Sequence, residues 1–196
     1  MKLINRHLMQ RIGFTGITLM AVATVTPIIA VVIYILAQGL PAISTEFLTG
    51  FPHDGMRAGG ILPAIVGTLY LTIGTAIFSV PLGIAAAIYL SEYAADTPLT
   101  RTIRIAIINL AGIPSVVYGL FGLGLFVLFL KFGTSILAAS MTLSIMTLPV
   151  IISTAEESLR SVPQAFRTVS ISLGATRWQT IRRIVLKEAL PGILTG

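Results

Sequence analysis

Two rows of serine and threonine are the first candidates for chemistry in this chain of 196 residues. Hydroxyls spaced about one helical turn apart can hydrogen-bond a polar solute that crosses between helices. They can equally bond back to their own helix and let neighbouring helices pack closely, which is the commoner role. Both roles stay open for these residues. The rows consist of Thr68, Thr72, Thr75 and Ser79 in one apolar segment, and of Ser140, Ser144 and Thr147 in another.

Enzyme chemistry finds little support in the same residues. A serine nucleophile needs an adjacent base, and no His, Asp or Glu stands beside the hydroxyls within the apolar segments. His53 has one neighbouring acid, Asp54, which is too few for a metal site, and the chain has no cysteine. No Gly-rich phosphate loop of the ATPase kind is present. We therefore expect no catalytic residue, cofactor or metal, and an intramembrane hydrolase or lipid-modifying transferase is disfavoured.

The composition places the hydroxyl rows in a membrane. Hydrophobic residues make up 55% of the chain and charged residues only 10%, against about 25% charged residues in soluble domains. The mean hydropathy is +0.95. Four uncharged stretches reach the roughly 20 residues that cross a bilayer. We predict an all-α integral membrane bundle with four complete transmembrane helices, at residues 12–37, 61–90, 105–130 and 136–155, and the start of a fifth at 189–196.

Proline and glycine interrupt two of these stretches. Pro81 is expected to bend the second stretch near its end, because proline removes one helical hydrogen bond. In the third stretch, Ile113-Pro114-Ser115 indicates either a helix broken beside a solute path or a packing kink.

The basic residues are distributed asymmetrically, which predicts the orientation. With a cytoplasmic amino terminus, four spans leave only Arg57 and Lys131 on the outer side. The positive-inside rule therefore predicts a multi-pass protein of the plasma (cytoplasmic or inner) membrane, and the net charge of +6 does not indicate nucleic-acid binding. The cytoplasmic side would carry Lys2, Arg6, Arg11, Arg101, Arg104, Arg160, Arg167, Arg177, Arg182, Arg183 and Lys187.

The polar segment 156–188 follows the fourth stretch and is predicted to form a helix, a glycine turn and a second helix. Ser161 with Gln164, and Thr176 with Gln179, fit capping boxes that would start the two helices. Gly174 lies between them, where a left-handed residue commonly ends a helix. The first helix, expected over 162–173, has one apolar face, made of Val162, Phe166, Val169 and Leu173, with Arg167 beside it.

Charged residues near the ends of the spans are expected to pair locally. Glu92 and Asp96 precede Arg101 and Arg104, which suggests exposed ion pairs of little energy. Glu156 and Glu157 precede Arg160 by four and three residues, the spacing of pairs on a helix surface.

Four passages and the polar segment resemble the permease subunits of binding-protein-dependent ABC importers, most closely the PstA-like branch that serves phosphate uptake. The spacing from Gly174 to Ile184 and Leu186 matches the loop motif of that family, in which Glu-Ala-Ala is followed by Gly, then Ile and Leu-Pro. The passages are GGILPAIVGTLY at 59–70, PLGIAAAIYLSEYA at 81–94, GIPSVVYGLFGLGLFV at 112–127 and EESLRSVPQAFR at 156–167.

The resemblance implies a type I importer permease with an amino-terminal part, residues 1–60, and a permease core, residues 61–196. It implies a second homologous permease subunit, an extracytoplasmic phosphate-binding protein and a cytoplasmic ATPase dimer that binds ATP and Mg. The ATPase-coupling loop would use Val162, Phe166, Arg167, Val169, Ser170, Leu173, Gly174, Ile184 and Leu186.

The sequence departs from the family pattern in two ways. Thr168, Val169 and Ser170 stand where Glu-Ala-Ala is expected, and Lys187 stands where proline is expected. The resemblance also implies six spans, so a carboxy-terminal truncation is expected. The alternatives are a permease for another solute, such as an amino acid or a different oxyanion, and a truncated remnant without function or with a purely structural role.

Overall fold

The computed structural model describes residues 6–195. The regular secondary structure in this range is helical, apart from one isolated β-bridge between His53 and Ala58. This confirms the all-α prediction. The α-helices are α1 (Arg6–Gly39), α2 (Thr45–Thr49), α3 (Leu62–Ile88), α4 (Pro98–Ala111), α5 (Ser115–Gly122), α6 (Ile136–Ser161), α7 (Gln164–Ser172), α8 (Arg177–Thr180) and α9 (Leu186–Thr195). Short 3₁₀ turns are η1 (Leu40–Ala42) and η2 (Asp54–Met56), and π-helical turns are η3 (Tyr89–Tyr93), η4 (Leu123–Phe129) and η5 (Ile181–Val185).

The chain divides into two compact units, and the boundary between them in the sequence falls between Ile65 and Val66. The first unit contains α1, a helix of 34 residues whose large apolar side chains from Met9 onward are mostly exposed. Such a surface suits a helix surrounded by lipid. Residues 1–5 of the predicted amino-terminal part, and Gly196 of the predicted fifth span, lie outside the described range.

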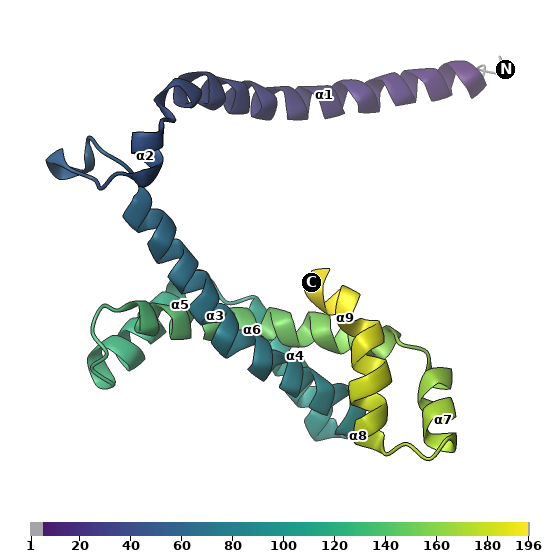
Figure 1. The fold of residues 1–196 in the computed structure, drawn as a ribbon. Helices are drawn as coiled ribbons and strands as arrows, with labels where there is room; N and C mark the ends of the chain where they lie inside the picture. The colour runs from purple at the N-terminus through teal and green to yellow at the C-terminus, as the bar shows by residue number, and fades with distance from the viewer. Residues whose placement is uncertain (1–5, 196) are drawn as a thin grey trace. The chain divides into compact units, whose positions relative to one another are not determined.

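Helix α6 forms the centre of the second unit and packs against α4, α5 and α9 (Figure 1). The core at its carboxy-terminal end consists mainly of small or branched apolar residues, which allow the helices to approach closely. Its fully buried members come from α3, α6, the link to α7, η5 and α9: Ala87, Ala155, Leu159, Val162, Val185 and Ala189.

Within residues 6–195, three helices are long and apolar enough to cross a membrane, and there are four spans if one bent pair counts as a span. The pair is α4 with α5 and η4, which meet at an angle of 96°. The third span predicted at 105–130 is therefore not one straight helix but part of this bent pair, and Ile113-Pro114-Ser115 marks a broken helix. The break arises because Pro114 has no N–H to continue the ladder of α4, and the residue before a proline avoids helical geometry.

One tyrosine stabilises this break. Tyr118, which is buried in α5, donates its hydroxyl to the carbonyl of Leu110 at 2.9 Å, close to the end of α4. The same carbonyl also accepts from the backbone N–H of Ile113 at 3.1 Å, so the Tyr118 hydroxyl is an additional donor that ties α5 to the end of α4 across the break.

We expect Tyr118→Phe to lower the free energy of unfolding by about 1 kcal/mol, because the change removes one buried hydrogen bond without altering the packing of the ring. Unfolding of the purified protein in detergent, titrated with a denaturing surfactant, measures the loss. An unchanged midpoint would show that the Ile113 N–H alone satisfies the Leu110 carbonyl and that the Tyr118 hydroxyl adds no stability.

Candidate functional site

The polar segment folds as the predicted helix, glycine turn and helix, but its first helix starts later than predicted. Helix α7 begins at Gln164 with Pro163 as its N-cap, and the Ser161 hydroxyl donates back to the Ser158 carbonyl at 2.8 Å. The capping box of Ser161 with Gln164 is therefore wrong. The reason is that Val162 precedes a proline, which holds it extended at ψ 123° and keeps it out of a helix.

The turn and the second helix match the prediction. Gly174 has φ +85°, in the left-handed region, and Thr176 and Gln179 form both halves of a capping box at the start of α8. The hydroxyls of Ser170 and Thr180, both buried, lie 2.9 Å apart and connect α7 to α8. The two helices therefore form a fixed elbow.

The predicted apolar face of α7 separates into two parts. Val162 is 4% exposed and belongs to the core, whereas Phe166, Val169 and Leu173 are 48%, 59% and 83% exposed. The three exposed side chains line a groove of about 600 Å³ that Ile184 also lines. Leu186, the other predicted position in this region, packs instead against the core. An exposed apolar row beside a groove is a surface on which another protein can dock.

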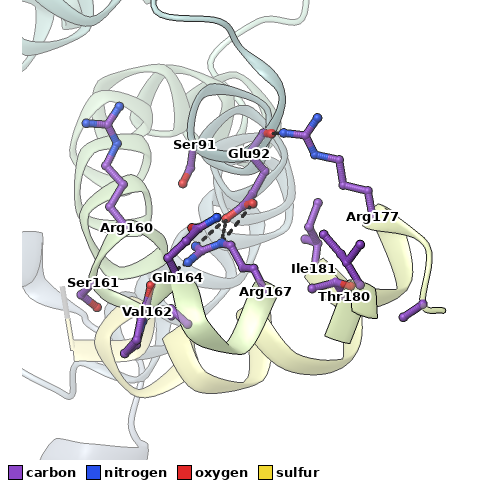
Figure 2. Close-up of a pocket in the computed structure, with 13 residues that line it drawn as sticks. Ser91, Glu92, Arg160, Ser161, Val162, Gln164, Arg167, Arg177, Thr180 and Ile181 are labelled. Atoms are coloured by element: carbon purple, nitrogen blue, oxygen red, sulfur yellow. Dashed lines mark hydrogen bonds and ion pairs between the residues drawn. The ribbon is translucent and has the colours of Figure 1, made fainter. Parts of the chain in front are cut away.

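Arg167 does not remain on the surface of α7 but reaches behind it to Glu92 in η3. Its Nη2 lies 2.7 Å from Oε1 of Glu92, and the two side chains are 12% and 8% exposed (Figure 2). Arg167 also donates to the carbonyls of Val162 and Leu159, at 2.6 and 2.8 Å. The predicted local pairing of Glu92 is therefore wrong, although Asp96 does pair with Arg101 on the surface.

A second long-range ion pair joins α4 to α6. Nε of Arg104 lies 2.7 Å from Oε1 of Glu156, and the two side chains are 21% and 12% exposed. Arg160 approaches the same oxygen at 3.0 Å, with the predicted spacing of four residues. Glu156 is thus largely buried rather than on the helix surface, because α4 packs along α6 and brings Arg104 over it.

The hydroxyl rows divide between a groove and the helix packing. Thr68, Thr72, Thr75 and Ser79 of α3, with Thr147 of α6, line a groove of about 790 Å³ that Ser115 also lines. Ser140 and Ser144 do not line it and are 1% and 3% exposed. A Cβ at Gly74 would overlap Ser140, so these small residues let α3 and α6 approach closely.

Hydrogen bonds within the helices already use several hydroxyls of the groove. Thr72 and Ser79 donate to the carbonyls of Thr68 and Thr75, and Thr147 donates to that of Ser144. Their oxygens keep lone pairs but the protons are engaged, so the groove presents acceptors more readily than donors.

Comparison with known proteins identifies the architecture. Residues 79–196, which hold the elbow, both buried ion pairs and most of the second unit, match the family described as "Binding-protein-dependent transport system inner membrane component". The chain belongs to this family. It is therefore a multi-pass membrane permease of the ABC importer class, as the resemblance implied.

Curated relatives support the same family membership over nearly all of the permease chain. It is 36% identical to "Probable ABC transporter permease protein YqgH" and 30% identical to YqgI, both from Bacillus subtilis, over 98% of its own length. It is 33% identical to "Phosphate transport system permease protein PstA 1" of Mycobacterium tuberculosis, again over 98%. The chain spans about two thirds of the length of these relatives: 67%, 65% and 64%.

Proposed function

We propose that this chain is the permease subunit of an ATP-driven importer of inorganic phosphate, and that α7 transmits the motion of a cytoplasmic ATPase to the membrane helices. The observation that carries the proposal is the exposed row of Phe166, Val169 and Leu173, held on an elbow whose angle Gly174 and the Thr176 cap fix. A rigid helix with an apolar face is a common ligand for a groove in a partner protein.

Phosphate as the solute is supported by the names of the PstA relatives, at 33% identity. Among the described residues, the groove of α3 and α6 is lined by hydroxyls and apolar residues and by no charged side chain. Such a lining offers an oxyanion few donors, so it does not itself select phosphate. Selection of phosphate therefore falls to an extracytoplasmic binding protein and to a second permease subunit that completes the path.

The orientation follows from the charge distribution and from the elbow together. An ATPase that binds α7 must be cytoplasmic. If the chain crosses the membrane four times before α7, with the bent pair counted as one crossing, the amino terminus lies on the same, cytoplasmic side. ATP and Mg would bind to that ATPase, and the permease subunit would bind the bilayer, the second permease subunit and the binding protein.

The ATPase contact is tested by Leu173→Asp in the assembled transporter. Leu173 is 83% exposed and lines the elbow groove, so the change should leave the fold intact while placing a charge in the interface. We expect the affinity for the ATPase to fall at least about tenfold, as for a well-placed interface residue. Co-purification and equilibrium binding in detergent measure the effect.

Leu99→Asp is the matched control, because Leu99 is also an exposed leucine, at 70%, but lies at the start of α4 outside the groove. Equal loss in both variants would contradict docking at the elbow. The solute is tested separately, by the uptake of labelled phosphate in competition with sulfate and an amino acid. Competition by either compound as strong as by unlabelled phosphate would contradict the phosphate assignment.

A further inference from the structure

Three arginines from three different helices converge on one π-helical turn, η3, at the end of α3. Arg104 from α4 donates to the Leu90 carbonyl at 2.8 Å. Arg167 from α7 binds the Glu92 carboxylate through Nε and Nη2. Arg177, the first residue of α8, donates to the Glu92 carbonyl (Figure 2). Its guanidinium also lies over the Tyr93 ring, 5.1 Å from the ring centroid.

The turn has open acceptors because the helix ends there. After η3 the chain becomes extended at Ala94, with ψ 128°, so carbonyls in the last turn have no helical partner. Guanidinium groups carry five donors in a fixed fork and satisfy such carbonyls while also pairing with a carboxylate. Glu92, at 8% exposure, needs a counter-charge, and Arg167 supplies it.

Apolar packing does little to hold α7 in place. Ser170 is the one buried residue within α7, and the helix leaves Phe166, Val169 and Leu173 exposed. Its attachments behind the elbow are the Ser170–Thr180 hydrogen bond and the five hydrogen bonds that Arg167 donates to Glu92, Leu159 and Val162. Arg167 is therefore the side chain of α7 that reaches α3.

From η3 the connection continues directly into the hydroxyl groove. The turn η3 follows α3 without a break, and α3 carries Thr75 and Ser79 in the groove lining. A displacement of α7 that pulls on Glu92 therefore acts on the same helix that lines the groove. The Arg104 bond to Leu90 extends the connection to α4.

We propose that η3 is the joint through which movement of α7 reaches α3, and that Arg167 and Glu92 are its positioning residues. The proposal rests on the proposed function, since it presupposes an ATPase that moves α7. The ion pair between Arg167 and Glu92 would then transmit movement from α7 to α3 in addition to stabilising the fold. Loss of the pair should uncouple ATP hydrolysis from solute transport.

The test measures both activities in the complete transporter, reconstituted in vesicles with its ATPase and binding protein. For Glu92→Gln, which keeps the size of the side chain but removes its charge, we expect the ATP hydrolysed per phosphate taken up to rise about tenfold. Glu92→Asp keeps the charge and should retain more coupling than Glu92→Gln. Asp96→Asn, in the exposed pair with Arg101, is the matched control and should leave the ratio unchanged.

The proposal is overturned if Glu92→Gln couples as well as the unaltered protein, or if Glu92→Asp is the worse of the two, since shape and not charge would then matter. If Glu92→Gln does not accumulate in the membrane, Arg167→Gln provides the same test, because it removes the other charge of the pair. An unaltered transporter that binds its ATPase but takes up no phosphate contradicts the proposed solute alone. In that case the role of η3 is tested by measuring, in the same variants, how far the binding protein stimulates ATP hydrolysis. Stimulation in Glu92→Gln equal to that in the unaltered protein would contradict the role of η3.

Discussion

Glu156→Ala is expected to lower the free energy of unfolding by about 3 kcal/mol, the low end of the range for breaking a buried ion pair. Glu156 binds Nε of Arg104 at 2.7 Å and Nη2 of Arg160 at 3.0 Å, and its side chain is only 12% exposed. Without it, Arg104 keeps its bond to the Leu90 carbonyl but has no counter-charge in a largely buried position. The low end applies because Arg160 is half exposed and returns to water.

Surfactant-induced unfolding of the purified permease measures this loss. Asp96→Ala is the control, since it breaks an ion pair with Arg101 in which the side chains are 73% and 70% exposed, and such pairs contribute at most about 1 kcal/mol. Glu156→Gln should lie between the two, because the amide still accepts from Arg104. If Glu156→Ala and Asp96→Ala lower the free energy of unfolding equally, Glu156 does not form a buried ion pair in the folded protein.

The helices and their order follow from the sequence because each depends on local signals. Long uncharged stretches predict α1, α3 and α6, and the cap of Thr176 and Gln179 predicts the start of α8. Positive φ at Gly174 follows from its place after an amphipathic helix. In these cases neighbouring residues determine the backbone, so no knowledge of the packing is needed.

The errors arise where one local signal overrides another or where tertiary contacts decide. Ser161 and Gln164 have capping-box spacing, but Pro163 lies between them and excludes a helix at Val162. Pro114 separates α4 from α5 rather than only bending one helix, although membrane helices often tolerate proline, and the bond from the Tyr118 hydroxyl to the Leu110 carbonyl holds the two helices together across the break.

The site itself was predicted only in part, for the same physical reason. The exposed face of α7 is a property of one helix and can be found by its spacing. The pairing of Glu92 with Arg167, 75 residues apart, depends on how α6 and α7 place the elbow beside η3. No spacing rule links such residues. The signal available was an acid at the end of an apolar stretch, which must find a cation wherever the fold buries it.

Gly174→Val is expected to weaken ATPase binding by at least about tenfold and to reduce uptake in proportion, through the backbone alone. Gly174 has φ +85°, where a left-handed residue with a Cβ costs roughly 1–2 kcal/mol, and more if the side chain is β-branched. Apart from the two adjacent residues, no heavy atom lies within 4 Å of a Cβ built at this position, so a loss seen with alanine cannot come from a clash of its side chain. The strain is relieved only if the angle between α7 and α8 changes.

A series of substitutions at Gly174 separates backbone strain from other effects. Asparagine tolerates the left-handed region and should retain most of the binding, alanine should lose more, and valine should lose most. Equilibrium binding of the ATPase to the detergent-solubilised permease gives the order, and hydrogen exchange over α7 and α8 reports whether the elbow has opened. Equal binding by the asparagine and valine variants would show that the elbow angle does not matter for docking, because the two differ chiefly in their tolerance of positive φ.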